Sequence, residues 1–369
     1  MTIGRVPPGI ASPARLQSWL NDLLGGDLGV PVELRDIQLI AGGRSNLTYR
    51  LAVGSPSGSR LLVLRRPPLG HVLPTAHDMS REFRVISALA GTDVPVAAAL
   101  ASCTDAAVIG APFYLMEHVP GVVLRSRADT AALTEAQAAD LAERLADMLA
   151  AIHGVDVAAV GLAGLGRGAG YLARQLDRWQ RQWQLSATRE VPGYAELVAR
   201  LTAALPEKGA GEAGGEVTLV HGDFRLDNVL VSLSPRPRIT AVVDWEMATL
   251  GDPLADLGLT LVYWTDPGEE GWLAPAGTPA GPGVTTDATA TPGFLTRAGF
   301  AAGYASRTGR DISRIGYYMA FGYFKLAVVL EGIHARYLQR KTVGEGFEAE
   351  GRAVPLLIAR AHQVLDGAR

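Results

Sequence analysis

The chain has 369 residues, enough for two or three domains or for one domain divided into two lobes around an enclosed site. Hydrophobic residues make up 48 % and charged residues 19 %, and 34 basic against 37 acidic side chains leave a formal net charge of −3. This composition excludes a wholly disordered chain. It also creates no strong field that would attract nucleic acid or an anionic membrane, so neither is expected as a partner.

The cysteine content and the apolar segments indicate in which cellular compartment the protein is expected. Cys103 is the single cysteine and cannot form an internal disulfide, and the N-terminal residues lack the apolar run of a secretory signal. The most apolar stretch, residues 94–116, is interrupted by Ser102, Thr104 and Asp105, so no membrane span is expected. These features predict a cytoplasmic protein.

The first third of the chain carries strand signals. Residues 36–40, 47–53 and 60–66 are rich in strand-forming residues and are separated by glycine-containing or proline-containing turns. Because three sequential strands are joined by short connections, they predict an antiparallel meander. Further strands are expected over residues 97–101 and 112–118.

Helical signals lie between these strands and throughout the rest of the chain. A helix is predicted over residues 78–90, with Asp78 as its N-cap. Later, Thr134 starts an apolar helical stripe, and residues 317–341 are apolar on most faces, as in a buried helix. Residues 266–293 are dense in Gly, Pro, Thr and Ala, which is typical of a lid, a binding loop or a disordered segment.

Two segments in the second half carry the chemistry. Residues 219–231 read LVHGDFRLDNVLV and place Asp223 five residues before Asn228, and residues 239–246 read ITAVVDWE and end a second apolar strand near Asp244. Phosphoryl transfer requires a carboxylate that positions and deprotonates a hydroxyl, and oxygen ligands that hold Mg²⁺ against nucleotide phosphates. Asp223 suits the first role, and Asn228 with Asp244 suits the second.

These segments resemble the catalytic and metal-binding loops of the aminoglycoside phosphotransferase-like kinases, which act on small hydroxylated molecules. A third block, residues 251–258 (GDPLADLG), follows in the order that this family shows. The resemblance implies ATP and Mg²⁺ as cofactors and a small hydroxylated molecule as partner. It also implies that Asp256 supports the catalytic loop through His221 or the main chain.

The resemblance further implies a bilobal α+β fold like that of the protein kinases. Residues 1–118 would form a nucleotide-binding lobe with an antiparallel sheet and one main helix, and residues 119–369 a larger, mostly helical lobe for catalysis and substrate binding. The pattern indicates no oligomeric state.

The nucleotide-binding residues of the family can be placed one by one. The loop between the first two strands contains Gly42, Gly43, Arg44 and Ser45, whose backbone amides could cradle phosphates. On the third strand the family has a lysine for the phosphates, paired with a helix glutamate. This chain has Arg65 there, with Glu82 as the expected partner; strand alternation favours Arg65 over its neighbour Arg66.

Residues 113–121 resemble the hinge that joins the lobes of such kinases. By that resemblance Met116 would lie behind the adenine, and the backbone of Glu117 and Val119 would make the two hydrogen bonds to it. Val63 would line the upper wall of the same pocket.

The acceptor is suggested by charge and by a narrower resemblance. From residue 292 to 369 there are 11 basic and 6 acidic side chains, a balance of +5 that argues against a polycationic aminoglycoside and for an anionic molecule. Several blocks resemble the kinase-like domain found fused to acyl-CoA dehydrogenase modules: residues 64–68, 73–77, 251–256 and 318–321. That resemblance implies a hydroxylated acyl chain, such as a hydroxyacyl-CoA, as acceptor.

Two other interpretations stay open. Arg65 in place of the lysine is compatible with a nucleotide-binding pseudokinase that acts as a regulatory or interaction module, although Asp223, Asn228 and Asp244 are all present. A protein kinase fits less well. His-Gly-Asp stands where protein kinases have His-Arg-Asp, Asp-Trp-Glu stands for Asp-Phe-Gly, and no Ala-Pro-Glu follows.

Overall fold

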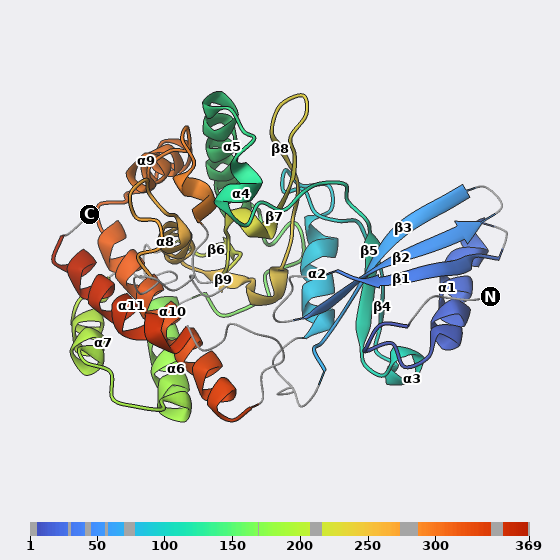
Figure 1. Cartoon of the computed structure of the whole chain (residues 1–369), viewed down its shortest axis with the longest axis horizontal. Coiled ribbons are helices and arrows are strands. Elements are labelled where there is room, and N and C mark those ends of the chain that lie inside the picture. The colour runs from blue at the N-terminus through green and yellow to red at the C-terminus, as the bar shows by residue number, and fades with distance from the viewer. Residues whose placement is uncertain are drawn as a thin grey trace. The chain divides into compact units, whose positions relative to one another are not determined.

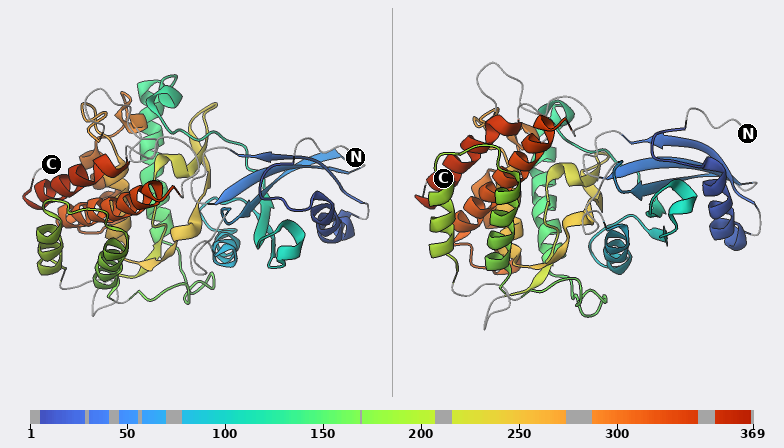
Figure 2. Two further views of the ribbon diagram at one scale, coloured as in Figure 1. Left: turned by 60° about the horizontal axis from the view of Figure 1, so that its bottom comes forward. Right: turned by 90° about the horizontal axis from the view of Figure 1, so that it is seen from below.

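The computed structural model describes residues 6–28, 31–40, 46–55, 58–69, 78–168, 170–206, 216–273, 287–340 and 350–367. The chain divides into two units. The N-terminal unit consists of residues 1–121 together with residues 240–246, and the C-terminal unit of residues 122–239 and 247–369. Each unit is described by itself (Figures 1 and 2).

The N-terminal unit is built on a five-stranded antiparallel sheet. The strands lie in the order β1-β2-β3-β5-β4, and their bounds are β1 Glu33–Leu39, β2 Leu47–Ser55, β3 Gly58–Arg66, β4 Ala99–Cys103 and β5 Phe113–Glu117. Successive pairing of β1 with β2 and of β2 with β3 confirms the predicted meander. Asp78 caps helix α2 (Met79–Leu89) by accepting hydrogen bonds from the amides of Ser80 and Arg81, as predicted.

Helix α1 (Pro13–Leu28) packs on this sheet and was not predicted. Its buried residues Leu16, Leu20 and Leu24 follow one another at the i, i+4 spacing of a helix face. They form one core with the β3 side chains of Leu62 and Leu64, while α3 (Ala106–Ile109) lies close to α1. Because side chains alternate along a strand, Val63 and Arg65 point to the other face of the sheet.

The C-terminal unit consists mainly of helices, several of which pack against the long helix α10. The helix bounds are α4 Arg127–Thr130, α5 Glu135–His153, α6 Tyr171–Ser186, α7 Tyr194–Ala203, α8 Pro253–Tyr263, α9 Arg297–Thr308, α10 Ile315–Leu338 and α11 Glu350–Leu365. Helix α10 packs against α6, α7, α8 and α11, and Figure 2 shows it side by side with α11. Most of its residues are buried, as its sequence predicts.

Short strands and 3₁₀ turns carry the motif segments. The strands are β6 Thr218–Val220, β7 Val229–Ser232, β8 Arg238–Val242 and β9 Thr249–Gly251, and the turns are η1 Leu226–Asn228, η2 Trp245–Met247 and η3 Asp287–Ala290. Strand β6 pairs antiparallel with β9, and β7 pairs with β8. At the start of α5, Thr134 and Gln137 form the capping box that the sequence predicts.

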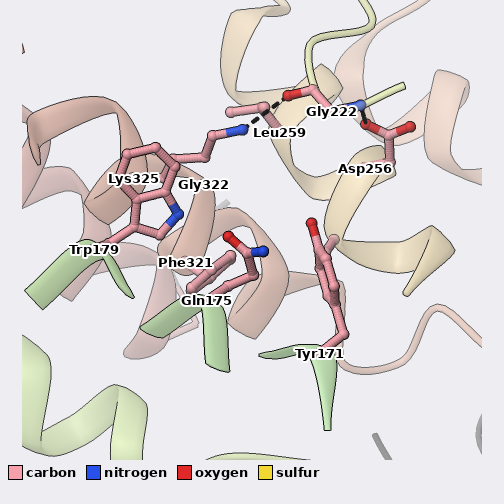
Figure 3. Close-up of a pocket in the computed structure, with 10 residues that line it drawn as sticks. Tyr171, Gln175, Trp179, Gly222, Asp256, Leu259, Phe321, Gly322 and Lys325 are labelled. Carbon is pink, nitrogen blue, oxygen red and sulfur yellow. Dashed lines mark hydrogen bonds between the residues drawn. The ribbon is translucent and has the colours of Figure 1, made fainter. Parts of the chain in front are cut away.

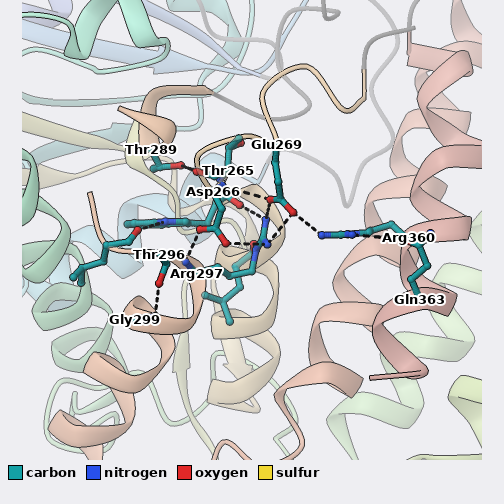
Figure 4. A network of polar contacts seen from close by, with 12 residues as sticks. Thr265, Asp266, Glu269, Thr289, Thr296, Arg297, Gly299, Arg360 and Gln363 are labelled. Carbon is teal, nitrogen blue, oxygen red and sulfur yellow. Dashed lines mark hydrogen bonds and ion pairs between the residues drawn. The ribbon is translucent and has the colours of Figure 1, made fainter. Parts of the chain in front are cut away.

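A buried arginine holds the segment that follows α8 (Figure 4). Arg297 donates to the carbonyls of Leu261 and Trp264 at 2.9 and 2.6 Å, and it pairs with Glu269 at 2.6 Å. Glu269 also accepts from Arg360 of α11 at 2.6 Å. The expected loop over residues 266–293 is therefore fixed at its beginning, while residues 274–286 lie outside the described residues.

Among the described residues, no helix combines the length and the apolar character that a membrane span needs.

Candidate functional site

The loop after β6 is held by a buried carboxylate of α8. Asp256, in the first turn of α8, accepts hydrogen bonds from the backbone amides of His221 at 2.7 Å and Gly222 at 2.9 Å. Burial opposes ionisation of this carboxyl, but the hydrogen bond and charge of His153 and the charge of His221 hold the pKa of Asp256 below its usual value. An ionised acceptor thus anchors two consecutive amides directly before Asp223.

Gly222 occupies a position that requires glycine. Its φ of +82° lies in the left-handed region, and a Cβ there would lie 2.7 Å from the backbone oxygen of Met247. The next amide, that of Asp223, donates to Nδ1 of the fully buried His221 at 3.3 Å. His221 therefore orders the loop through a contact with the main chain.

Asp223 and Asn228 lie side by side. The Asn228 side-chain amide donates to the backbone oxygen of Asp223 at 2.8 Å and to its carboxylate Oδ2 at 3.1 Å. The amide nitrogen of Asn228 thus faces Asp223, so the amide oxygen is the atom it can offer to a cation. The turn η1 brings these two side chains together over a separation of five residues.

Two further side chains surround the Asp223 carboxylate. Tyr263 at the end of α8 is hydrogen-bonded to Asp223, and burial first, then the charge of Asp223, raise the pKa of this tyrosine well above its usual value. Arg225 lies over the Tyr263 ring at 4.8 Å and has its Nε 3.8 Å from Asp223 Oδ2. Its terminal nitrogen pairs with Asp227 at 2.8 Å.

A buried chain of hydrogen bonds supports Asp256 from behind. His153 Nε2 lies 3.2 Å from Asp256 Oδ2, and its Nδ1 lies 2.6 Å from the Tyr304 hydroxyl. Burial lowers the pKa of His153, which favours the neutral ring. The neutral tautomer that fits both partners donates from Nε2 to Asp256 and accepts from Tyr304 at Nδ1.

The N-terminal unit holds a second cluster, centred on Arg65. Its Nε donates to Glu82 at 3.1 Å, a terminal nitrogen pairs with Asp244, and Glu246 lies 3.9 Å away. Burial opposes the charged form, but the carboxylates of Glu82 and Asp244 hold the pKa of Arg65 above its ordinary value. Arg66 points elsewhere and donates to the carbonyls of Gly9 and Pro67.

Two of these carboxyl residues are unusual in their own right. Glu82 is 1 % exposed, and burial raises its pKa to about 7 although Arg65 and the Tyr114 hydroxyl act in the opposite direction. Asp244 has a φ of +67°, a left-handed conformation that costs a residue with a Cβ about 1 kcal/mol or more. Strain of this kind concentrates at functional positions.

The expected phosphate loop can be described only at its C-terminal edge. Gly42, Gly43, Arg44 and Ser45 lie outside the described residues. The next residue, Asn46, is buried and donates from its side-chain amide to Glu246 at 2.9 Å.

The expected hinge residues occupy the end of β5. Val63 of β3 is the direct cross-strand partner of Met116, so these two side chains are neighbours. The Glu117 amide donates to the carbonyl of Ala98 at 2.9 Å. Any contact of its backbone with a base must therefore come from its carbonyl oxygen, while Val119 lies two residues beyond the end of β5.

The predicted residues thus fall into two groups, each within one unit. The structure brings together His221, Asp223, Asn228 and Asp256 in the C-terminal unit, and Arg65, Glu82 and Asp244 in the N-terminal unit. Sequence reasoning gave no role in the site to several neighbours of these groups: Tyr114, His153, Tyr263, Glu246 and Lys325. The lone lysine in the otherwise apolar stretch of α10 was a signal that could have revealed Lys325.

Asn228 and Asp244, each considered by itself, carry donor atoms suited to Mg²⁺. Among the described residues there is no group of three or more His, Cys, Asp or Glu side chains suited to a metal ion. Mg²⁺ is usually held by one or two carboxylates together with substrate phosphates, so such a cage is not required. An amide oxygen of Asn228 and a carboxylate of Asp244 are ligands of the hard type that this ion prefers.

The family model for the phosphotransferase enzyme family, APH, matches residues 36–288 of the chain. This range includes the second half of β1, β2 to β5, the loop after β6 and α8. The chain belongs to this phosphotransferase family.

Three similar proteins illustrate the relationship. Acyl-CoA dehydrogenase family member 10 from Mus musculus is 34 % identical over 325 residues, which cover 88 % of this chain and 28 % of the relative. A crystal structure of a candidate aminoglycoside phosphotransferase from Ralstonia eutropha is 30 % identical, with a TM-score of 0.77, and the match covers 97 % and 99 % of the two chains. A thermostable mutant of aminoglycoside phosphotransferase APH(4)-Ia, solved with ADP and hygromycin B, shares the fold at 16 % identity, with a TM-score of 0.57 and coverage of 93 % and 98 %.

The chain spans 28 to 40 % of the length of the curated relatives that it matches.

Proposed function

We propose that the chain is an ATP- and Mg²⁺-dependent phosphotransferase that moves the γ-phosphoryl group to a hydroxyl of a small molecule in the cytoplasm. The observation that carries this proposal is the pairing of Asp223 with Asn228 on a loop whose backbone is anchored by Asp256. The reaction needs a fixed carboxylate that accepts the hydroxyl proton, with a cation ligand beside it. The chain's membership of a phosphotransferase family supports the same reaction.

The proposed roles follow from side-chain chemistry. Asp223 orients the acceptor hydroxyl and takes its proton, and Asn228 and Asp244 hold Mg²⁺. When bound, the metal neutralises charge on the β- and γ-phosphates. Arg65, held by Glu82, contacts the nucleotide phosphates, since a guanidinium can grip two phosphate oxygens.

The nucleotide would be held by the remaining residues named from the sequence. The backbone of residues 42–45 would contact the phosphates. Val63, Met116 and the backbone of Glu117 and Val119 would surround the adenine. Val63 and Met116 support this assignment because they are cross-strand neighbours.

For the acceptor we favour a hydroxyacyl-CoA or another anionic hydroxylated metabolite over an aminoglycoside. The excess of five basic side chains after residue 291 disfavours a substrate that carries several ammonium groups. The relatives named as acyl-CoA dehydrogenases support an acyl substrate, since the chain covers a part of them.

The acceptor class can be tested by ATP turnover with Mg²⁺ over a panel of hydroxyacyl-CoAs, free hydroxy acids, aminoglycosides, choline and sugars. We expect ADP release that depends on the presence of a hydroxyacyl-CoA or a hydroxy acid. Turnover with an amino sugar or choline, and none with the acyl compounds, would contradict the proposed acceptor class. The proposed kinase reaction would still hold.

A pseudokinase is the second candidate, and Arg65 is the observation that favours it. The guanidinium already pairs with both Glu82 and Asp244, one of the proposed Mg²⁺ ligands. Tight nucleotide binding without turnover on any acceptor of the panel would support a regulatory or interaction module.

A further inference from the structure

A partly buried ammonium lies directly behind the catalytic loop. Lys325 of α10 donates from Nζ to the backbone oxygen of Gly222 at 2.8 Å (Figure 3). No ion pair within 4 Å joins this ammonium to a carboxylate in the part of the chain that the structure describes. A charge that is partly withdrawn from water is expensive unless it is paired or has a function, so the position of Lys325 needs an explanation.

The contact with Lys325 completes a clamp around Gly222. The peptide group before Gly222 donates its N–H to Asp256 at 2.9 Å. The peptide group after Gly222 is held at both ends, because its oxygen accepts from Lys325 and its N–H, that of Asp223, donates to His221. The two peptide planes that meet at Gly222 are thereby fixed, and with them the direction in which Asp223 leaves the loop.

The groups around Lys325 include negative charges that stabilise its ammonium. Burial lowers the pKa of Lys325, while the negative charges of Asp223 and Asp256 oppose this effect. The ammonium therefore lies in the negative potential of Asp223 in the loop and of Asp256 in α8, while the charge of Arg178 acts with burial to lower the pKa. On its other side it lies 5.7 Å from the centre of the Trp179 ring, which also favours a cation.

The space beside Lys325 is too small for an acceptor molecule. The pocket that Lys325 lines with Tyr171, Gln175 and Trp179 has a volume of about 20 Å³ (Figure 3). This volume holds about one water molecule. A water there would also satisfy Trp179 Nε1, which is buried and has no hydrogen-bond partner among the described residues. Lys325 thus acts on the loop and not on a bound substrate.

We propose that Lys325 is a positioning residue of the phosphotransferase, whose ammonium fixes the Gly222–Asp223 peptide group and so aims the Asp223 carboxylate at the acceptor hydroxyl. The proposal rests on the proposed function. It goes beyond that function by giving a role to a residue outside the three motif segments.

The first test is Lys325→Met, which keeps the length of the side chain and removes its charge and its hydrogen bond. We expect kcat to fall about 100-fold, the order of loss that a misplaced catalytic group causes, with the KM for ATP unchanged. Arg336→Met, at an exposed position of the same helix, is the matched control and should retain wild-type kcat. A Lys325→Met kcat within threefold of wild type, or a change confined to the acceptor KM, would overturn the proposal.

Chemical rescue distinguishes positioning from simple packing. Lys325→Ala leaves a gap into which n-propylammonium fits as the missing part of the side chain. We expect propylammonium to restore kcat by at least about tenfold relative to 1-propanol, because only the amine supplies the charge. Equal rescue by both compounds, or by neither, would contradict the proposal.

Hydrogen exchange separates this inference from the proposed reaction. In Lys325→Met the amides of residues 219–228 should exchange faster than in wild type, while those of α5 should not change. Faster loop exchange in a protein that transfers no phosphoryl group would refute the proposed function and leave the clamp intact. Unchanged loop exchange would refute the clamp whatever the activity.

Discussion

Arg65 is the cation among three carboxylates of the N-terminal unit. It pairs with Glu82 and Asp244, and Glu246 lies 3.9 Å away. Its side chain is 12 % exposed and that of Glu82 is 1 % exposed, so little solvent screens this pair. Removal of the guanidinium would leave a buried carboxyl without its cation.

Arg65→Met should therefore lower the free energy of unfolding by about 3 kcal/mol, the order found when one partner of a buried ion pair is removed. Arg60→Met on the same strand is the control, because Arg60 is 44 % exposed and pairs with Glu117 at the surface. The control should lose less than about 1 kcal/mol. Urea unfolding measures both values, and equal losses would show that the cluster adds nothing to stability.

Glu82 should make the stability of the nucleotide-free protein depend on pH. Burial raises its folded-state pKa to about 7, above its value in the unfolded chain. A raised carboxyl pKa contributes stability that is fully present below about pH 4.5 and is lost as the pH rises through 7. The loss for this residue is about 3 kcal/mol.

Glu82→Gln should remove this dependence. Relative to wild type, the unfolding free energy of the variant should therefore be higher at pH 8 than at pH 5. Urea unfolding at both values checks this. A difference that stays constant between the two pH values would mean that Glu82 is ionised throughout.

At the residue scale, the site residues that can be predicted are those that lie close to one another in the sequence. The separation of Asp223 and Asn228 and the block around Asp256 identify these residues because the local sequence encodes a loop and a helix start. Lys325 contacts the loop, and His153 contacts Asp256 behind it, each from a position about a hundred residues away in sequence. Such contacts depend on how the helices pack, which one sequence does not reveal.

The segment after α8 depends on one arginine. Arg297 is 8 % exposed and satisfies two backbone carbonyls and the carboxylates of Asp266 and Glu269 (Figure 4). Its loss would take the guanidinium donor from the two carbonyls and one ion-pair partner from each carboxylate, and Glu269 would keep Arg360.

Arg297→Met should thus cost about 3 kcal/mol of unfolding free energy. Arg307→Met, in the same helix α9, is the matched control: Arg307 pairs with Glu143 and Asp147, whose side chains are 46 % and 50 % exposed. Its loss should cost less than about 1 kcal/mol. Guanidinium unfolding compares the two, and a similar small loss for both would refute an anchoring role for Arg297.

At the scale of helices and strands, the sequence predicted the features that depend on interactions between residues close in sequence. The N-cap of α2, the capping box of α5 and the three-strand meander depend on neighbours in sequence, and all three are present. Helix α1 was missed although Leu16, Leu20 and Leu24 have helical spacing, because only its packing on the sheet shows that this stripe has a partner.

At the scale of the whole molecule, the proposed roles are divided between the two units. Asp223 belongs to the C-terminal unit, whereas Asp244 belongs to the N-terminal unit through residues 240–246. Substitutions of the two aspartates should therefore have different effects on nucleotide binding.

Asp244→Ala should weaken nucleotide binding in Mg²⁺ by at least about tenfold and leave binding in EDTA nearly unchanged, because only the metal-dependent part is lost. Asp223→Asn should leave both affinities close to wild type. Calorimetric titration with a non-hydrolysable ATP analogue measures them, and an equal loss of metal-dependent affinity in both variants would contradict the division of roles.

The most direct test of the account is the appearance of a phosphate ester on an acceptor hydroxyl, followed by ³¹P NMR with Mg²⁺-ATP and a hydroxyacyl-CoA. We predict that wild type forms the ester with stoichiometric ADP and that Asp223→Asn forms it at least about 100-fold more slowly, the order of loss for a general base. Ester formation at the wild-type rate by Asp223→Asn would contradict the central claim that Asp223 is the catalytic carboxylate.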